Sequence, residues 1–500
     1  MQYISTRDAS KRVSASQAIV AGISPDGGLF LPETIPQFAP AELSALCAAD
    51  YPHRAARVLS RFLTDFTEDE LLSFAEKAYA RDKFPPTAVA PVVSIGGNGH
   101  VLELFHGPTS AFKDFALQML PYLLTASLRK NGETRTVMIL VATSGDTGKA
   151  ALEGFADVPG TKICVFYPHG GTSSMQRLQM TTQRGGNVGV YAVRGNFDDA
   201  QNGVKAIFTD EAFKAELAAR GFLLSSANSI NWGRLAPQIA YYYSAYCDMV
   251  NAGKIRMGEK INVCVPTGNF GNILAAWYAK HSGLPIARLI CASNRNNVLS
   301  DFLTTGVYDR NRAFHVTSSP SMDILISSNL ERLLSLTLGD EAQLRALMAA
   351  LKAEGRYEIS ADAREKLQAE FSCGWADDAA VAQTIAETYA ADGYLPDTHT
   401  AVGLRVWREY KQKTGDATPT LLAATASPFK FCPAILGALD KPVPEGDFER
   451  LSALSRETGL PVPPRLAELE GLCERFTGIV SPDEMRSAVD KTLKESEAMQ

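Results

Sequence analysis

Between residues 96 and about 306 the chain alternates short apolar runs with longer runs of helical periodicity. TVMILVA at 136–142 precedes GKAALEGFA at 148–156, and INVCVP at 261–266 precedes NILAAWYAKHS at 272–282. Strand–helix alternation of this kind predicts an α/β fold with mostly parallel sheets flanked by helices. The runs predicted as strands are apolar along their whole length, as expected when helices cover both faces of a sheet.

The length of the chain, 500 residues, is too great for one hydrophobic core. The patterns predict three parts: an N-terminal segment over residues 1–95, a region of two α/β subdomains over 96–440, and a helical tail over 441–500. Within the second part, residues from about 320 to 400 are mainly helical and charged, and we interpret them as a helical insertion.

Charge and composition exclude several classes of function. A formal net charge of -6 gives no support for binding nucleic acid or an anionic membrane, because such proteins usually carry a basic excess. There is no apolar run of signal-peptide or membrane-spanning length, so we expect a cytoplasmic protein. Eight scattered cysteines without a C-x-x-C pair indicate reduced thiols, and seven dispersed histidines predict no metal site.

One predicted strand-to-helix loop, PTGNFGN at 266–272, is rich in glycine and asparagine. Ligands of open α/β sheets bind at the carboxyl ends of the strands, and glycines let the backbone approach them. Unpaired N–H groups at the start of the following helix suit a phosphate, although a plain glycine-rich turn is the alternative. The loop matches neither the Walker nor the dinucleotide fingerprint. The candidate phosphate ligands are Gly268, Asn269, Phe270, Gly271 and Asn272.

A second loop, VATSGDTG at 141–148, gathers hydroxyls, glycines and a carboxylate before a predicted helix. Ser144 and Thr147 could hold an anionic group at that helix start. An ordinary helix N-cap made by Asp146 or Thr147 is the simpler interpretation of the residues taken alone.

HGPTSAFKDFALQ at 106–118 places Lys113 in the first turn of a predicted helix, where the positive end of the helix dipole opposes an ammonium group. A solvated surface lysine is the simplest interpretation. The alternative is a buried amine that stays uncharged and reacts with an aldehyde, as Schiff-base lysines do.

Two further stretches carry polar residues in unusual places. Asn231 and Arg234 precede a long aromatic helix, and the planar guanidinium of Arg234 could bind a phosphate or carboxylate or form a surface ion pair. Thr425 ends an apolar strand in AATASPFKF, either as a buried hydroxyl donor or as a turn residue. A Schiff-base lysine combined with a phosphate-binding glycine loop suggests the cofactor pyridoxal phosphate.

These motifs resemble those of the threonine synthase family, of the long bacterial and fungal type, over nearly the whole chain. They occur in the family's order: ELFHGPTSAFKDFALQ, ATSGDTGKAAL, RGNFDDAQNGVK, SANSINWGRLAPQ, VPTGNFGNI, SPSMDI, DTHTAVG and ATASPFKF. The resemblance implies fold-type II of the pyridoxal-phosphate enzymes, shared with tryptophan synthase β and threonine deaminase. It also implies that residues 96–440 form the catalytic region.

The resemblance assigns roles residue by residue. Lys113 matches the lysine that binds the cofactor as a Schiff base, residues 268–272 match its phosphate loop, and Thr425 matches the hydroxyl facing the pyridine nitrogen. Asp146 falls where related enzymes often have an asparagine near the cofactor's O3'. The implied contacts to substrate anions are Ser144, Thr147, Asn231 and Arg234.

The implied reaction converts O-phospho-L-homoserine and water to L-threonine and phosphate, the last step of threonine biosynthesis, in a monomer or homodimer. The sequence departs from the family pattern where Ser427 replaces a histidine, Phe429 an alanine and Thr398 a proline, which bears on the substrate pocket. Two alternatives stay open. One is a phospho-lyase that yields a keto acid, and the other is a binding protein that kept the fold without the cofactor.

Overall fold

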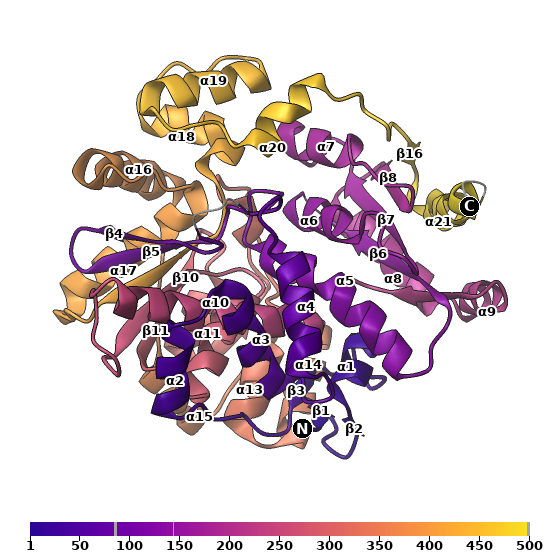
Figure 1. Ribbon diagram of the computed structural model, residues 1–500, viewed down its shortest axis with the longest axis horizontal. Coiled ribbons are helices and arrows are strands. Elements are labelled where there is room, and N and C mark those ends of the chain that lie inside the picture. The colour runs from indigo at the N-terminus through magenta and orange to yellow at the C-terminus, as the bar shows by residue number, and fades with distance from the viewer. Residues whose placement is uncertain (85–87, 144, 498–500) are drawn as a thin grey trace.

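The computed structural model describes residues 1–84, 88–143 and 145–497 of the chain. Two sheets built mainly of parallel strands form its body, and helices pack on their faces (Figure 1). The predicted α/β fold with mostly parallel sheets is therefore confirmed. None of the described helices combines the length and the apolar character that crossing a membrane requires.

The larger sheet has six strands, and β10 and β15 are its two central strands. All neighbouring strands are parallel except β4, which pairs antiparallel with β5. In spatial order the strands are β14 (Phe371–Trp375), β11 (Ile286–Ser293), β10 (Ile261–Pro266), β15 (Thr420–Ala424), β5 (Gly99–Glu103) and β4 (Val92–Ile95).

The smaller sheet has five strands, all parallel, and its β7 and β8 are buried along their whole length. Its outermost strand comes from the C-terminal tail. In order the strands are β16 (Ile479–Val480), β8 (Val188–Val193), β7 (Thr161–Pro168), β6 (Thr136–Ala142) and β9 (Phe222–Ser225).

Helices between and around the strands cover both sheets. Helix α10 (Trp232–Asn251) packs against α3, α5 and α11 at once, which explains its nearly continuous burial. The side chain of Asn231 starts this helix by accepting a hydrogen bond from Gly233 N at 2.8 Å. The other helices of the α/β body are α5 (Lys113–Lys130), α6 (Asp146–Phe155), α7 (Ser174–Thr181), α8 (Phe197–Thr209), α9 (Glu211–Ala219), α11 (Gly271–His281) and α12 (Val298–Thr305).

The N-terminal segment packs into the same core as the α/β body. The ring of Tyr3 lies 5.3 Å from that of Trp232 in α10, and Trp232 lies 5.2 Å from Tyr278 in α11. The segment contains a small antiparallel sheet, β1 (Tyr3–Ser5), β2 (Arg12–Val13) and β3 (Phe30–Pro32), and four helices, α1 (Ala15–Ala21), α2 (Pro40–Cys47), α3 (Tyr51–Phe62) and α4 (Glu68–Ala78).

Residues 307–414 are largely helical but also supply β14 to the larger sheet. They comprise β12 (Val307–Asp309), the 3-10 turn η1 (Pro320–Met322), α13 (Leu330–Leu338), α14 (Glu341–Glu354), β13 (Arg356–Glu358), α15 (Ala361–Glu370), β14, α16 (Asp378–Asp392) and α17 (Thr398–Thr414).

The C-terminal tail is helical with one strand, and it crosses from the larger sheet to the smaller one (Figure 1). Met485, Val489 and Leu493 of its last helix are buried against the smaller sheet. Before the tail, β15 is followed by η2 (Pro428–Phe431) and α18 (Cys432–Ala438). The elements of the tail are α19 (Asp447–Thr458), α20 (Pro464–Ala467), η3 (Glu468–Gly471), β16, η4 (Pro482–Glu484) and α21 (Met485–Glu497).

Candidate active site

Lys113 is the first residue of α5, and its side chain is only 12% exposed. Its Nζ lies 3.7 Å from Asp146 Oδ2 and donates a hydrogen bond to Ser321 Oγ at 3.3 Å. The interpretation as a solvated surface lysine is therefore wrong. Three remote segments, the starts of α5 and α6 and the turn η1, meet at this amine.

The surroundings of Lys113 favour its uncharged form. Burial lowers the pKa of this amine, Asp146 opposes that effect, and the nearby cations of Lys430 and Arg234 lower the pKa further. A buried amine with a lowered pKa is a better nucleophile toward an aldehyde than an ordinary lysine.

Asp146 is surrounded by donors. Lys430 Nζ donates to its Oδ1 at 2.5 Å, Gln176 Nε2 donates to the same oxygen at 2.9 Å, and Ser321 Oγ donates to Oδ2 at 3.4 Å. Burial alone would raise the pKa of this carboxyl, but the charges of Lys430 and Lys113 outweigh burial and hold the pKa well below its usual range. Helix α6 begins at Asp146 with Gly145 as its N-cap, so the simpler interpretation of Asp146 as the cap is wrong.

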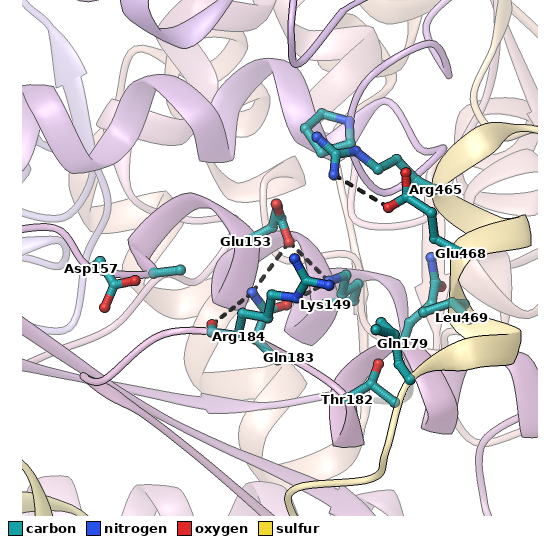
Figure 2. Close-up of a pocket in the computed structure, with 13 residues that line it drawn as sticks. Lys149, Glu153, Asp157, Gln179, Thr182, Gln183, Arg184, Arg465, Glu468 and Leu469 are labelled. Atoms are coloured by element: carbon teal, nitrogen blue, oxygen red, sulfur yellow. Dashed lines mark hydrogen bonds and ion pairs between the residues drawn. The ribbon is translucent and has the colours of Figure 1, made fainter.

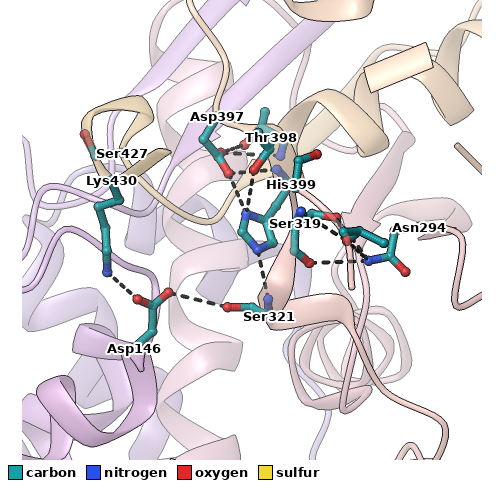
Figure 3. Close-up of polar contacts among 12 residues, drawn as sticks. Asp146, Asn294, Ser319, Ser321, Asp397, Thr398, His399, Ser427 and Lys430 are labelled. Atoms are coloured by element: carbon teal, nitrogen blue, oxygen red, sulfur yellow. Dashed lines mark hydrogen bonds and ion pairs between the residues drawn. The ribbon is translucent and has the colours of Figure 1, made fainter. Parts of the chain in front are cut away.

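Lys430 is a functional residue that the sequence analysis missed. It lies in η2, a few residues after β15, and its side chain is completely buried. Figure 3 shows this side chain reaching Asp146. Besides Asp146, its Nζ donates to the carbonyl of Thr109 at 3.1 Å. The available signal was a lone lysine between two phenylalanines in SPFKF, at the end of an apolar strand. Gln176 and Ser321 were also missed.

The predicted phosphate loop lies between the end of β10 and the start of α11. A Cβ on Gly268 would stand 2.7 Å from the carbonyl oxygen of Ser321, so only glycine fits there. Phe270 is the N-cap residue of α11 and adopts the left-handed conformation with φ 61°, while its side chain is 1% exposed. The turn η1 thus touches both the loop and Lys113.

The rest of the loop is held from two sides. Ser327 Oγ donates to the carbonyl of Gly268 at 2.7 Å, and Asn329 donates to that of Asn269. The side-chain oxygen of Asn272 accepts hydrogen bonds from Tyr241 and Tyr242. The N–H groups in the first turn of α11, which include that of Gly271, have no partner within the helix and can bind an anion.

Arg234 is buried rather than part of a surface ion pair. It is 4% exposed, its Nη1 donates to the carbonyl of Ala227 at 2.7 Å, and its buried Nε has no partner among the described residues. Burial lowers the pKa of this guanidinium to about 10. Asn231 also donates to the carbonyl of Ile19 at 3.0 Å, so its amide already has two structural bonds and its contact with substrate stays a prediction.

Thr425 follows β15, and its carbonyl accepts a hydrogen bond from Phe112 N at 2.9 Å, which joins it to the start of α5. The residue is 6% exposed, so the interpretation as a buried residue holds. Thr147 is half-buried on α6, and its substrate contact stays a prediction. Ser144 lies outside the described residues.

These residues fit an anionic cofactor such as pyridoxal phosphate. Three basic residues, Lys113, Lys430 and Arg234, are buried here. They outnumber the nearby carboxylates of Asp146 and Asp114. The unpartnered Nε of Arg234 and the glycine loop offer donors to anions. A bound anion would pair with the basic groups of this site.

A separate cleft lies between α6, α7 and the C-terminal elements α20 and η3 (Figure 2). Four of its charged groups form two ion pairs: Lys149 with Glu153 at 2.9 Å and Arg465 with Glu468 at 3.5 Å. Gln183 also donates to Glu153. The cleft contains none of the candidate residues, and its charges are largely balanced, unlike those around Lys113.

Comparison with known proteins identifies the family of the chain. Three family models match the chain: "Threonine synthase N terminus" over residues 2–79, "Pyridoxal-phosphate dependent enzyme" over 96–425 and "Threonine synthase, C-terminal" over 400–489. Threonine synthase of Pseudomonas aeruginosa is 40% identical over 87% of this chain and 90% of its own, and that of Methylobacillus glycogenes is 40% identical over 91% and 95%.

Human "Threonine synthase-like 1" is 41% identical over 92% of this chain, which spans 64% of that relative's length. Among solved structures, the PLP-bound threonine synthase from Brucella melitensis is 38% identical with a TM-score of 0.87, covering 99% of each chain. Yeast threonine synthase is 32% identical with a TM-score of 0.88 over 100% of this chain and 99% of its own. The ordered motifs, the fold and the buried lysine site agree with these matches, and the chain belongs to the threonine synthase family of pyridoxal-phosphate-dependent enzymes.

Proposed function

We propose that this protein is a threonine synthase that converts O-phospho-L-homoserine and water to L-threonine and phosphate. The observation that carries the proposal is the buried Lys113 amine in a site with excess positive charge, within a chain of this family. A substrate with a carboxylate and a phosphate, together with an anionic cofactor, would balance that charge.

In this proposal Lys113 would bind pyridoxal phosphate covalently, the loop 268–272 would hold its phosphate, and the Thr425 hydroxyl would be the partner of its ring nitrogen. Asp146 would be the partner of the cofactor's O3', and the contact with Lys430 keeps that carboxylate ionised. When bound, the cofactor withdraws electrons from the substrate and so makes its Cα and Cβ protons removable.

The residues of the chain perform the binding and proton transfers. The Lys113 amine takes the Cα proton and later returns one, and its lowered pKa keeps it available as a base. Arg234 and the start of α6, with Thr147 and Ser144, bind the substrate's two anionic groups, and Asn231 shapes the same region. The neutral Thr425 hydroxyl leaves the ring nitrogen without a strong acid nearby, which disfavours transamination.

The test is a product assay on O-phospho-L-homoserine with wild type and Lys113→Ala, with Lys214→Ala as a surface-lysine control. We expect equal amounts of threonine and phosphate from wild type and the control and neither from Lys113→Ala. Formation of 2-oxobutyrate and ammonia instead of threonine would establish the phospho-lyase alternative. If wild-type protein did not turn yellow when pyridoxal phosphate is added, the result would support the alternative of a binding protein without the cofactor.

The remaining expectations belong to the same proposal. We place the enzyme in the cytoplasm, as a monomer or homodimer, with residues 96–440 as its catalytic region between the N-terminal segment 1–95 and the tail 441–500. Support comes from the continuous strand–helix pattern of the region, which holds Lys113, the phosphate loop and Thr425. Size-exclusion chromatography with light scattering measures the oligomeric state.

A further inference from the structure

Two motifs, SPSMDI at 319–324 and DTHTAVG at 397–403, have no role in the reaction as described so far. The structure joins them next to Asp146 (Figure 3). Asp146 in turn lies 3.7 Å from the amine of Lys113. The backbone N–H of Ser321, in η1, donates to Nε2 of His399 at 3.2 Å. His399 lies in the first turn of α17 and is 2% exposed, so water cannot readily replace this bond.

A carboxylate fixes the orientation of the His399 ring. Asp397 is the N-cap of α17, and its Oδ1 lies 2.8 Å from Nδ1 of His399 and also accepts the His399 backbone N–H at 2.9 Å. Because Nε2 accepts a hydrogen bond from Ser321, the ring proton resides on Nδ1 and is donated to Asp397. The ring is therefore a directed acceptor for one N–H group of η1.

Ser321 connects that ring to the reacting amine. Its Oγ accepts from Lys113 Nζ at 3.3 Å and donates to Asp146 Oδ2 at 3.4 Å, while its carbonyl packs against Gly268. Both side-chain bonds are at the long end of the hydrogen-bond range, so a displacement of about 0.5 Å would remove them. The position of η1 thus decides whether Lys113 keeps its hydroxyl partner.

The segment around η1 has other supports that do not involve His399. Asn294 Nδ2 donates to Asp323 Oδ1 at 2.7 Å, and Thr317 Oγ1 donates to the same oxygen at 2.7 Å. Asn294 Nδ2 also donates to Ser319 Oγ at 3.1 Å, which joins Ser319 to the same network. Loss of the His399 bond is therefore expected to displace the turn rather than unfold the segment.

We propose that His399 is a positioning residue for Lys113 and acts through Ser321, whose hydroxyl touches the reacting amine. The inference rests on the proposed function only in taking Lys113 as that amine. His399 holds η1 in place, and the Ser321 hydroxyl then directs Nζ away from a purely ionic contact with Asp146. The other charged groups that face Lys113, Lys430 and Arg234, are untouched by this device.

The test measures the Lys113 amine directly, by competitive acetylation of the full-length protein freed of bound pyridoxal phosphate. Trace acetic anhydride is applied across a pH series, and mass spectrometry gives the rate at Lys113 relative to the exposed Lys214. The variants are Ser321→Ala, His399→Leu, the double variant, and His399→Gln, which can return an acceptor near the Nε2 position. Ser318→Ala, which removes an exposed hydroxyl bonded to Asp378, is the matched control on the same segment.

The hydrogen bond to Ser321 Oγ stabilises the ammonium form of Lys113, so its loss leaves more of the reactive free amine. At pH values below the titration midpoint of Lys113, we therefore expect Ser321→Ala and His399→Leu to raise its relative acetylation rate at least threefold. The double variant should match the single ones, and His399→Gln and Ser318→Ala should behave as wild type. In the loaded enzyme, Ser321→Ala and His399→Leu should lower kcat at least tenfold with KM changed less than threefold.

The proposal would be overturned if Lys113 in His399→Leu were acetylated at the wild-type rate. It would also be overturned if the change in acetylation rate in the double variant equalled the sum of the changes in the two single variants. Should His399→Leu not fold, an unchanged acetylation profile in Ser321→Ala is enough to overturn it. Failure of the proposed function has a different signature. Wild type would then form no threonine, while the acetylation results would still show whether Ser321 and His399 act on Lys113.

Discussion

Replacing Lys430 by methionine tests the charge balance of the site. The substitution keeps a long apolar side chain but removes the ammonium group that lies 2.5 Å from Asp146. The remaining partners of the Asp146 carboxylate are then the amine of Lys113 at 3.7 Å and the neutral amide of Gln176 at 2.9 Å. We expect Lys430→Met to destabilise the folded protein strongly, because it leaves a buried carboxylate with its weaker ionic partner alone.

The magnitude follows from the distances. At an effective dielectric constant of about 20, the attraction of Asp146 is ~7 kcal/mol for Lys430 at 2.5 Å and ~4 kcal/mol for Lys113 at 3.7 Å. The variant therefore loses the stronger of the two attractions. Removing one partner of a buried pair costs about 3–5 kcal/mol net. With an unfolding entropy of about 2.1 cal/mol/K per residue over 500 residues, the midpoint falls by ~3–5 °C.

The assay is thermal unfolding followed by circular dichroism, on protein freed of pyridoxal phosphate so that cofactor binding adds no stability. Lys214→Met is the matched control, since it removes an exposed ion pair with Glu211 worth at most ~1 kcal/mol. Asp146→Asn combined with Lys430→Met removes both charges and should recover at least half of the loss seen in Lys430→Met.

A Lys430→Met protein that melts within about 1 °C of wild type would refute the reasoning on magnitude. Strictly additive losses in the double variant would refute the reasoning on pairing, because two coupled charges cannot contribute independently.

Two further predictions concern cofactor binding and pH. Gly268→Ala should weaken pyridoxal phosphate binding at least tenfold in an absorbance titration, because its Cβ would stand 2.7 Å from the Ser321 carbonyl; Gly437→Ala, with open space around it, should bind as wild type. Burial raises the pKa of Asp114 to about 6 from 3.8, so the folded state binds that proton more tightly and stability falls as pH rises from about 4 to about 6. Asp114→Asn should therefore remove this pH-dependent loss of unfolding free energy, which amounts to up to ~3 kcal/mol at pH 7. Denaturant unfolding at several pH values measures it. An unchanged pH profile would argue against the raised pKa.

The sequence alone determined the features that depend on local patterns. Apolar runs of strand length followed by helical periodicity were enough for the α/β class, because each pattern reports the burial of its own segment. The family followed from motifs in a particular order, and the glycine-rich loop was recognised because backbone access requires glycine locally. Gly268 in the structure has this property.

Only the tertiary structure decided how the site is assembled. Lys113, Asp146, Ser321 and Lys430 belong to four distant segments. The pairing of β15 with β5 brings Lys430 close to Lys113, whereas Asp146 comes from the smaller sheet and Ser321 from η1. Alternation of strands and helices does not specify that order. For the same reason the burial of Lys113 could not be predicted from its own helix. The role of Lys430 became visible only from the 2.5 Å contact between its ammonium group and Asp146. The chemistry of the site depends on burial and on partners hundreds of residues away, and both are properties of the folded chain.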